Sequence, residues 1–488
     1  MTRLASSKDS NVTPVFTKAS LERTRTTLSP LTLRLTKDER ARLEELATTP
    51  VFTTKDYQSA ERALDQATGS MVNQRGFAVS SSHIDAAIKA QNAKMKRAIG
   101  GKLSEEQQNA LRHALGTRQL SSVVGLAGAG KSTLLATAQN AWAKQGVTVH
   151  GAALAGKAAE ELQNASGIKS RTLASLELSW ENGNEPISKG DVLVIDEVGM
   201  IGTRQLARVA TKMQGIGAKL VLVGDPNQLQ PIEAGAPFRQ IVKTHGAARL
   251  TEIHRQKVDR QKQASRDLAD GDMWTALSIY EKRGAVSRGE TRDTAIEALV
   301  ETYAMDVAAH GTFKSRLAFA HKRKDVHALN QAIRSALRSN GEASPETLFT
   351  TDTGKRAFAV DDRIVFTRNN KGIGVKNGML GTVVKAENGQ MAIALDGDED
   401  RLVRFNPKAF RSSDHGYAVT IHKSQGATVD QSYVLASRSM DRHLAYVAMT
   451  RHRDDLGIFV NNRDRPTWAM DRTQQRRPTR TRDGPSMG

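Results

Sequence analysis

The residues best suited to chemistry lie in the segment GLAGAGKST, at positions 125 to 133. Gly125, Gly130, Lys131 and Ser132 match the spacing Gly-x-x-x-x-Gly-Lys-Ser/Thr. Glycines let backbone amides approach a phosphate, the lysine can neutralise β- and γ-phosphate oxygens, and the serine hydroxyl suits Mg²⁺. Because a strand-like run precedes the segment and a helical run follows it, we expect a nucleotide site here. The alternative is a glycine turn that leads into an ordinary helix.

Two further strand-like runs are followed at their carboxyl ends by residues with acidic or amide side chains. DVLVIDE ends in Asp196, which would hold Mg²⁺ through water, and in Glu197, which would orient and deprotonate an attacking water. KLVLVGDPNQLQPI places Asp225 and Gln228 at the carboxyl end of its strand, where ligands of open α/β sheets bind. Gln228 could contact both a γ-phosphate and a neighbouring domain. Either run alone could be a buried strand that merely ends in exposed acids, but with the glycine-rich loop they predict hydrolysis of a nucleoside triphosphate.

Three more side chains could complete such a site. Gln107, in LSEEQQNAL, could pair with an adenine edge through two hydrogen bonds, as amide side chains do. Arg255, in LTEIHRQ, and Arg451, in YVAMTRHRDDLGIFV, could extend from a second sheet domain to the phosphates and stabilise transition-state charge. Such arginines are worth a factor of ~10³ to 10⁵ in rate. Considered singly, a glutamine on an amphipathic helix or a solvated arginine is the more common situation.

The charge of the chain indicates a polyanionic partner. Lys and Arg number 71 against 52 Asp and Glu, which leaves a net charge of +19. A solvated basic surface is the alternative, because net charge alone does not identify nucleic acid. The segment GYAVTIHKSQGATVD adds His422, Lys423 and Gln425 within one turn, and these side chains suit a sugar-phosphate backbone and coupling to a γ-phosphate.

Composition excludes several other classes of site. The chain has 488 residues, enough for about two to four domains. It has no cysteine, which excludes disulfides, thiolate zinc sites, iron–sulfur clusters and a cysteine nucleophile. No apolar run approaches the ~18 residues of a membrane span, and the N-terminus has no apolar signal-peptide core. We therefore expect a cytoplasmic protein without a membrane partner.

Periodicity divides the chain into sheet domains and smaller pieces. After Gly100-Gly101, strand-like runs alternate with helical stretches, the pattern of a parallel sheet with helices on both faces, and a second region of this kind follows. Short strands split by Asn-Gly and Asp-Gly turns indicate a small barrel inserted in the second sheet domain. The expected parts are a flexible leader (1–35), a helical N-terminal module (36–100), a first sheet domain (101–245), a second sheet domain (246–355 and 412–465), the inserted barrel (356–411) and a basic disordered tail (466–488).

In their order, these segments resemble the Q motif and motifs I to VI of superfamily 1 helicases of the RecD-like, 5′ to 3′ branch (superfamily 1B). The resemblance covers roughly residues 100 to 462. The segment GAALAGKAAEEL (151–162) departs from the Ala-Pro-Thr-Gly-Lys-Ala-Ala of RecD proteins, because Leu154 and Ala155 replace proline and threonine. Together with SRTLASLE, DEVGMIGTRQLARV and IHKSQGATVD, it is similar to the helicase part of TraA/MobF conjugative relaxases.

This resemblance implies two RecA-like P-loop NTPase domains, 1A and 2A, with ATP and Mg²⁺ between them, an SH3-like β-barrel 2B as the insertion, and a short 1B pin at about 178–191. It implies ATP-dependent movement along single-stranded DNA and unwinding of a duplex with a 5′ tail during conjugation, with relaxosome proteins as candidate partners. The implied roles are nucleotide binding by Gln107, Gly125, Gly128, Gly130, Lys131, Ser132, Thr133 and Asp225, metal binding by Ser132 and Asp196, catalysis by Lys131, Asp196, Glu197, Gln228, Arg255 and Arg451, and DNA contact by Lys157, Thr172, His422, Lys423 and Gln425.

One departure concerns the relaxase reaction. Relaxases of this family need an N-terminal catalytic tyrosine and a His-x-Asp…His-x-His metal cluster, but the first histidine here is His83 and the sequence has no His-x-His. We therefore expect a helicase-only or truncated member without DNA-nicking activity. Two alternatives to a helicase stay open, namely a translocase that does not separate strands, since the pin is short, and a non-catalytic DNA-binding remnant. The intact motif lysine, acids and arginines argue against a remnant.

Overall fold

The computed structural model describes residues 12–14, 52–231, 233, 235–311, 314–339, 344–387, 389–424, 426–466 and 468. Gln425, residues 36–51 of the expected N-terminal module, nearly all of the leader and most of the tail lie outside these residues. Of the leader, the described part is strand β1 (Val12–Pro14), which pairs antiparallel with β2 (Phe52–Thr54) although the sequence has no strand period there. Of the tail, Trp468 is buried and its Nε1 donates to the Met440 carbonyl oxygen (2.8 Å), so the expectation of disorder is wrong at this residue.

The first part of the chain forms a parallel six-stranded sheet in the order β5-β4-β6-β7-β3-β8. All residues of β7 are buried, as expected for a strand covered by helices on both faces. The parallel α/β architecture predicted for this part is confirmed. The strands are β3 (Leu120–Gly125), β4 (Val149–Ala153), β5 (Ser170–Thr172), β6 (Val192–Ile195), β7 (Lys219–Gly224) and β8 (Ala248–Leu250), and the helices are α5 (Glu105–Ala114), α6 (Lys131–Lys144), α7 (Gly156–Ser166), α8 (Leu173–Glu181), α9 (Thr203–Ile216) and α10 (Pro237–His245).

Strand β8 lies beyond residue 245, where we placed the end of the first sheet domain. It pairs in parallel with β3, so the first sheet continues to Leu250. A strand of three residues carries too little periodicity to be assigned to a sheet from sequence, because its partners are decided by packing.

Two helices that precede the first sheet pack onto its helices. In α3 (Lys55–Asn73), Met71 shares a core with Met213 of α9, and in α4 (Ser81–Ile99), Ala87 shares another core with Trp142 of α6. Their N-caps are Thr54 and Ser80, whose side chains accept backbone N–H groups of the first turns. Within the described residues, these helices have no apolar core of their own. They extend the first sheet unit, whereas the sequence predicted a separate module.

The second sheet is also parallel, in the order β18-β10-β19-β20-β9. The sequence prediction of a second parallel-sheet unit is confirmed. Its strands are β9 (Val286–Gly289), β10 (Arg316–Ala320), β18 (Ala418–Thr420), β19 (Val429–Ala436) and β20 (His452–Asn461), and its helices are α11 (Asp259–Asp270), α12 (Met273–Glu281), α13 (Arg292–His310), α14 (Arg323–Ser339) and α15 (Arg442–Met449).

An antiparallel sheet is inserted between α14 and β18. Its order is β16-β15-β14-β13-β17, and a separate hairpin, β11–β12, precedes it. Gly389 and Gly397 have positive φ angles in the tight turns between β14, β15 and β16, as the Asn-Gly and Asp-Gly signals predicted. The insertion is wider than 356–411, and its SH3-like character stays a prediction. The strands are β11 (Thr347–Thr351), β12 (Gly354–Phe358), β13 (Arg363–Phe366), β14 (Leu380–Glu387), β15 (Gln390–Leu395), β16 (Asp398–Phe405) and β17 (Ser413–His415).

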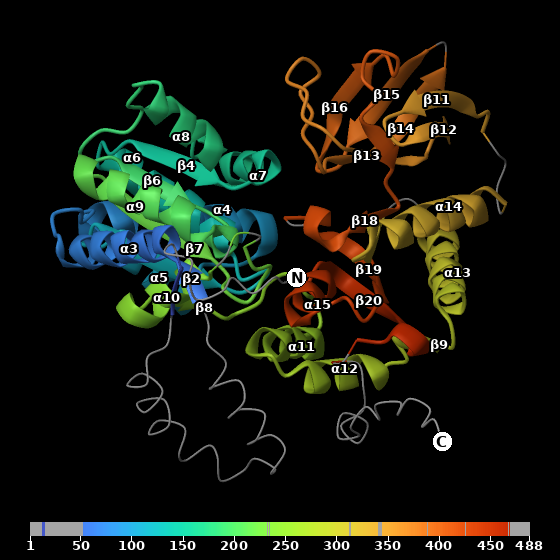
Figure 1. Ribbon diagram of the computed structural model, residues 1–488, viewed down its shortest axis with the longest axis horizontal. Helices are drawn as coiled ribbons and strands as arrows, with labels where there is room; N and C mark the ends of the chain where they lie inside the picture. Colours follow the sequence, from blue (N-terminus) through green and yellow to red (C-terminus); the bar gives the residue numbers. More distant parts are fainter. Residues whose placement is uncertain are drawn as a thin grey trace, which may run out of the picture.

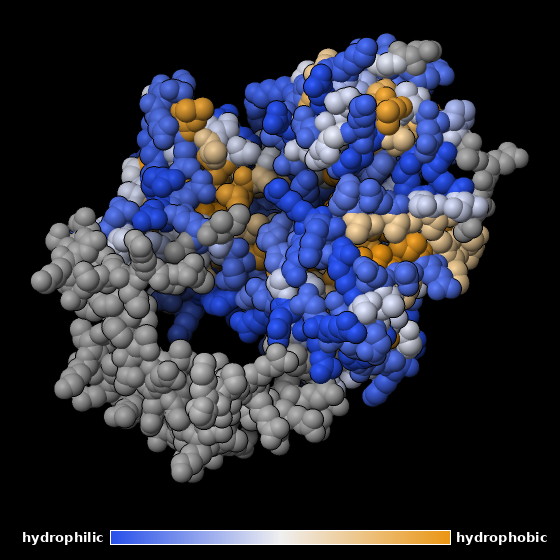
Figure 2. Space-filling view, turned by 45° about the vertical axis from the view of Figure 1, so that its right-hand side comes forward, coloured by the Kyte–Doolittle hydropathy of each residue, from blue (hydrophilic) through white to orange (hydrophobic). Residues whose placement is uncertain are grey.

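Figure 1 shows the first sheet unit on the left, the second sheet at the lower right and the insertion at the upper right. The surface seen in Figure 2 is mostly hydrophilic, with several apolar areas, one of which lies on its right-hand side over α13 and α14. That area coincides with a shallow groove whose lining includes Ile296, Val300 and Met305. Among the described helices, none combines the length and the apolar character that crossing a membrane requires.

Candidate nucleotide site and nucleic-acid interface

The glycine-rich loop (residues 125–130) precedes the N-terminus of α6, and its glycines leave the backbone uncovered by side chains. We call this loop the cradle. Gly128 and Gly130 have φ angles of +81° and +83°, which favour glycine. A Cβ on Gly130 would lie 2.3 Å from Gln107 Nε2, and one on Gly125 would lie 2.7 Å from Lys131 Cγ. Lys131 Nζ donates to the Gly125 carbonyl oxygen (2.9 Å) and so folds back over the loop. The first helical turn therefore presents backbone N–H groups where a phosphate can bind.

Ser132 and Thr133 follow in the first turn of α6. Ser132 is exposed and Thr133 is partly buried. A side chain that is exposed at the mouth of the cradle can supply an oxygen ligand, as the metal role expected of Ser132 requires.

Two adjacent carboxyl groups stand at the end of β6. Burial and the charge of Glu197 raise the pKa of Asp196 to about 7, and Lys131 opposes this shift. Glu197 has a φ of 52°, which is uncommon for a residue with a side chain and occurs most often at functional sites. Its backbone N–H donates to Asp196 Oδ1 (2.8 Å). A pair of acids that repel one another in this way is stabilised by a cation, so the residues present fit Mg²⁺ beside a triphosphate.

Arg451 lies between α15 and β20 in the second sheet unit, directly before the strand, and its side chain is buried. Its Nε donates to the Val447 carbonyl oxygen (2.9 Å), while its Nη2 has no hydrogen-bond partner among the described residues. Burial lowers the pKa of Arg451, and the charge of Glu197 opposes this effect. A buried guanidinium nitrogen without an acceptor is costly, so an anionic ligand such as a phosphate fits here.

Arg255 belongs to the segment that leaves the first sheet, and it packs directly on the glycine-rich loop. A Cβ on Gly128 would lie 2.5 Å from Arg255 Cβ. Its Nη1 donates to the Thr450 carbonyl oxygen (2.7 Å), and burial followed by the charge of Arg451 lowers its pKa to about 9. The expectation that Arg255 reaches across from the second sheet domain is therefore wrong, because β8 anchors this segment in the first sheet.

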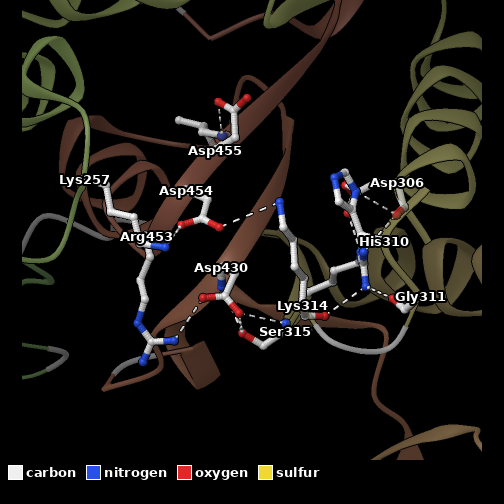
Figure 3. Close-up of polar contacts among 12 residues, drawn as sticks. Lys257, Asp306, His310, Gly311, Lys314, Ser315, Asp430, Arg453, Asp454 and Asp455 are labelled. Atoms are coloured by element: carbon white, nitrogen blue, oxygen red, sulfur yellow. Dashed lines mark hydrogen bonds and ion pairs between the residues drawn. The ribbon is translucent and has the colours of Figure 1, made fainter. Parts of the chain in front are cut away.

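The side chain of Arg453, two residues after Arg451, is exposed and has a carboxylate partner of its own. Figure 3 shows its side chain paired with Asp430, at a distance of 3.1 Å, and Asp430 also accepts from Ser315 Oγ (2.9 Å). Lys257 pairs with Asp454 in the same region. Of the two arginines in the run RHR, Arg451 is thus the one placed beside the nucleotide residues.

Tyr446 connects the two sheet units, and sequence reasoning did not single it out. Its hydroxyl donates to Asp225 Oδ2 (2.6 Å) and accepts from the Ala127 backbone N–H (3.1 Å). Asp225 is 1% exposed, and burial raises its pKa against the effects of Lys131 and Tyr446. In this conformation Asp225 therefore supports the interface between the units, and its expected contact with nucleotide stays a prediction. A lone tyrosine in the apolar helix α15 was the available signal, because buried tyrosine hydroxyls need a partner.

The loop after β7 docks on α15. Gln228 is buried, and its Oε1 has no hydrogen-bond partner among the described residues. His443 Nδ1 lies 2.8 Å from the Asn227 carbonyl oxygen, and Leu229 belongs to the same apolar core as residues of α15. This places Gln228 at the contact between the units, where the proposed sensor of a γ-phosphate would act.

Gln107 lies against the cradle, but half of its amide is engaged. It forms a capping box with Ser104, in which Oε1 accepts from the Ser104 backbone N–H (3.1 Å). Its Nε2 is the atom that faces Gly130. The two-bond adenine contact that we expected would require Oε1 to leave Ser104, so this role stays a prediction.

The residues expected to contact DNA come from both sheet units. Lys157 is the second residue of α7. Thr172 ends β5, and its hydroxyl caps α8 by accepting from Ser175 N–H (3.2 Å). His422 and Lys423 follow β18 in the second sheet, and burial lowers the pKa of both. Lys157 and Lys423 are brought together near Gly378 of the insertion, whereas the Thr172 hydroxyl is already used by a helix cap.

Glu161 is a further acidic residue that sequence reasoning missed. A Cβ on Gly426 would lie 2.0 Å from Glu161 Oε2, so α7 touches the loop that follows β18. Burial raises the pKa of Glu161, Lys157 lowers it, and Glu197 raises it. Glu161 is therefore an electrostatic neighbour of Glu197. The doubled glutamate in KAAEEL was the signal that could have indicated it.

Comparisons with known proteins show which families this chain is similar to. Residues 102–291 match the AAA domain family, and residues 354–460 match the viral superfamily 1 RNA helicase core domain. The chain is 40% identical over 436 residues to a probable conjugal transfer protein TraA of Sinorhizobium fredii, covering 89% of this chain and 38% of that protein. It is 28% identical to the ATP-dependent RecD2 DNA helicase of Deinococcus radiodurans, covering 78% of this chain and 52% of the relative. A solved structure of a Bacteroides Pif1 aligns with 77% of this chain and 96% of that one, at 18% identity and a TM-score of 0.49.

The chain thus spans little more than a third of the length of the TraA protein that it matches. The resemblance inferred from the ordered motifs is confirmed by these relatives. In sequence, the chain is similar to the TraA conjugal transfer proteins and, more distantly, to the RecD2 DNA helicase.

Proposed function

We propose that this chain is an ATP-driven motor that moves 5′ to 3′ along single-stranded DNA and unwinds duplexes with a 5′ tail during conjugative transfer. The observation that carries the proposal is the position of Arg451. It comes from the second sheet unit, has a guanidinium nitrogen without a hydrogen-bond partner in the described part of the chain, and is an electrostatic neighbour of Glu197 in the first unit. One nucleotide bound at the cradle would thus be held by charged groups of both units.

Hydrolysis would follow from the roles of these groups. Lys131 and the amides of the cradle hold the β- and γ-phosphates, Glu197 accepts a proton from the attacking water, and Arg451 neutralises charge that grows in the transition state. Mg²⁺, when bound near Ser132 and Asp196, supplies further charge neutralisation.

Movement would follow from the location of the site between two units. When the γ-phosphate leaves, the anion that attracts Arg451 toward the cradle is gone, so the closed arrangement loses stability. DNA held by Lys157 on one unit and by His422 and Lys423 on the other would then be passed along as the units separate. ATP and Mg²⁺ are the implied ligands, and relaxosome proteins are the proposed partners.

The test is the rate of ATP hydrolysis with and without single-stranded DNA. We expect stimulation by DNA, loss of turnover in Lys131→Ala, and retention of salt-sensitive DNA binding in that variant. Lys144→Ala changes an exposed lysine at the other end of α6 and is the matched control. Turnover at the wild-type rate in Lys131→Ala would refute the site. Unwinding of 5′-tailed duplexes but not 3′-tailed ones tests the polarity.

A translocase that does not separate strands is the second candidate, because the segment expected to form the pin is tied to the first unit. Glu185 pairs with Lys212 of α9 (2.6 Å), and Ile187 is buried in the core beside this helix. A segment held in this way offers little to insert between strands. Removal of a protein block from single-stranded DNA without unwinding of a 5′-tailed duplex would favour this candidate.

A further inference from the structure

A carboxylate of the first sheet unit forms ion pairs with the insertion. Glu160 lies on α7, and its Oε2 and Oε1 atoms are 3.2 Å from Lys376 Nζ and 3.5 Å from Arg401 Nη1. Lys376 belongs to the loop between β13 and β14, and Arg401 lies on β16. In Figure 1, α7 occupies the edge of the first unit that faces the insertion. Glu160 therefore joins two parts of the molecule that are distant in sequence.

The loop that carries Lys376 is shaped by its own contacts. Asn370 and Val375 pair across it, and Arg401 donates to the Gly374 carbonyl oxygen. Arg401 thus has a structural role within the insertion in addition to its contact with Glu160. Lys376 has no such second role among its described ion pairs, so its side chain can change partner without disturbing the loop.

Two lysines of the sheet units lie near this contact. Gly378, two residues after Lys376, approaches both units, since a Cβ there would lie 3.8 Å from Lys157 Cδ and 3.7 Å from the Lys423 carbonyl oxygen. Lys157 is already paired with Glu161 (3.6 Å), so Lys376 and Arg401 are the two cations that Glu160 contacts. One carboxylate carries a single negative charge, so the contact keeps a net positive charge.

A phosphodiester could replace Glu160 in this contact. The Glu160 side chain is 20% exposed and those of Lys376 and Arg401 are 34% and 37% exposed, while Glu160 Oε2 itself is buried without a hydrogen-bond partner among the described residues. Partly exposed ion pairs of this kind contribute little, and they leave this oxygen poorly satisfied. A phosphate offers the same kind of oxygen acceptors, binds arginine in two-bond geometry, and releases counterions when it is neutralised.

We propose that Lys376 and Arg401 form a phosphodiester-binding site of the insertion, and that Glu160 occupies this site until a single strand of nucleic acid enters between α7 and the loop around Lys376. This inference rests on the proposed function, because it assumes that the chain binds single-stranded DNA. When a phosphate displaces Glu160, Lys376 and Arg401 of the insertion lose their contact with α7 and bind the nucleic-acid strand instead. Glu160 thereby makes binding weaker than the cations alone would give.

Equilibrium binding of a fluorescent oligo(dT) to the full chain without nucleotide tests this inference. Glu160→Gln keeps the shape of the side chain and removes the competing charge. We expect Kd to fall by about two- to fivefold, the range that removal of one exposed ion pair gives. Adding Lys376→Ala should abolish this gain. Glu387→Gln is the matched control, because Glu387 pairs with Lys385 within the insertion (2.8 Å).

Three outcomes would overturn the inference. The first is equal tightening in Glu160→Gln and Glu387→Gln, which would reflect net charge alone. The second is a gain that persists after Lys376→Ala, and the third is no change in affinity in Glu160→Gln. Failure of the proposed function is a separate result, since it would appear as ATP hydrolysis that wild-type protein performs equally with and without DNA.

Discussion

Arg451 and Arg453 stand two positions apart on the chain but have opposite surroundings. Arg451 is buried beside the nucleotide residues, whereas Arg453 is half exposed and paired with Asp430. We expect Arg451→Ala to bind ATP and to hydrolyse it ~10³- to 10⁵-fold more slowly, because charge in the transition state loses its partner. Arg453→Ala should keep turnover within about twofold, since an exposed ion pair contributes little. Steady-state hydrolysis of both variants checks this, and equal rates would remove the role assigned to Arg451.

A second prediction at the residue scale concerns pH. Burial and Glu197 raise the pKa of Asp196 from 3.8 to about 7. The folded protein then holds a proton that the unfolded chain releases, so this group stabilises the fold at low pH and the contribution is lost as pH rises from about 4 through 7.

Asp196→Asn should remove this dependence. We expect the free energy of unfolding at pH 8 without Mg²⁺ to rise by on the order of 1 kcal/mol, because the cost of burying a charged carboxylate and its repulsion from Glu197 both disappear, while hydrolysis is lost. Thermal unfolding in EDTA between pH 5 and 8 measures the effect. A variant that is less stable than wild type at pH 8 would contradict it.

At the scale of elements, α3 shows how a helix becomes part of a neighbouring unit. The 3.6-residue period predicted the helix, but its partner is α9, a helix far along the chain. Met71 of α3 is 0% exposed, so Met71→Ala should lower the free energy of unfolding by ~2 to 5 kcal/mol.

Met305→Ala is the control for this prediction, because Met305 on α13 is 58% exposed and should change stability by less than ~0.5 kcal/mol. Chemical denaturation of Met71→Ala and Met305→Ala measures the two changes in stability. The rate of ATP hydrolysis of each variant is the second measurement. If Met71→Ala unfolds α3 while the first sheet and its nucleotide site persist, α3 is a separate module after all.

At the scale of the whole molecule, the contact between the sheet units depends on a buried hydrogen-bond chain. Tyr446→Phe keeps the ring but leaves Asp225 and the Ala127 N–H without their partner. We expect a loss of about 1 to 3 kcal/mol in stability and slower hydrolysis, because the arrangement of Arg451 and the cradle loosens.

Tyr57→Phe is the matched control for Tyr446→Phe. The Tyr57 hydroxyl is 2.9 Å from Thr203 Oγ1 within the first unit, so its removal should leave hydrolysis unchanged. Hydrolysis rates and denaturation curves are measured for Tyr446→Phe and Tyr57→Phe. They compare the loss of a hydrogen bond between the two units with the loss of one inside the first unit. The same loss of turnover in both variants would show that Tyr446 has no special role at the interface.

The sequence by itself determined the two parallel sheets, the cradle around Lys131 and the acids after β6. These features are read from spacing and periodicity within short segments, where backbone geometry places each residue relative to its neighbours. The antiparallel insertion was likewise predicted from its glycine turns, although its limits were drawn too narrowly.

Only the tertiary structure decided which residues meet across the two units. It placed Arg255 on the first unit, turned Asp225 toward Tyr446, and brought Glu160 to the insertion. Such contacts join segments that are far apart along the chain, and they depend on how whole sheets dock. Periodicity and motif spacing carry no information about that docking, because the free energy that selects it comes from side-chain packing and burial between elements.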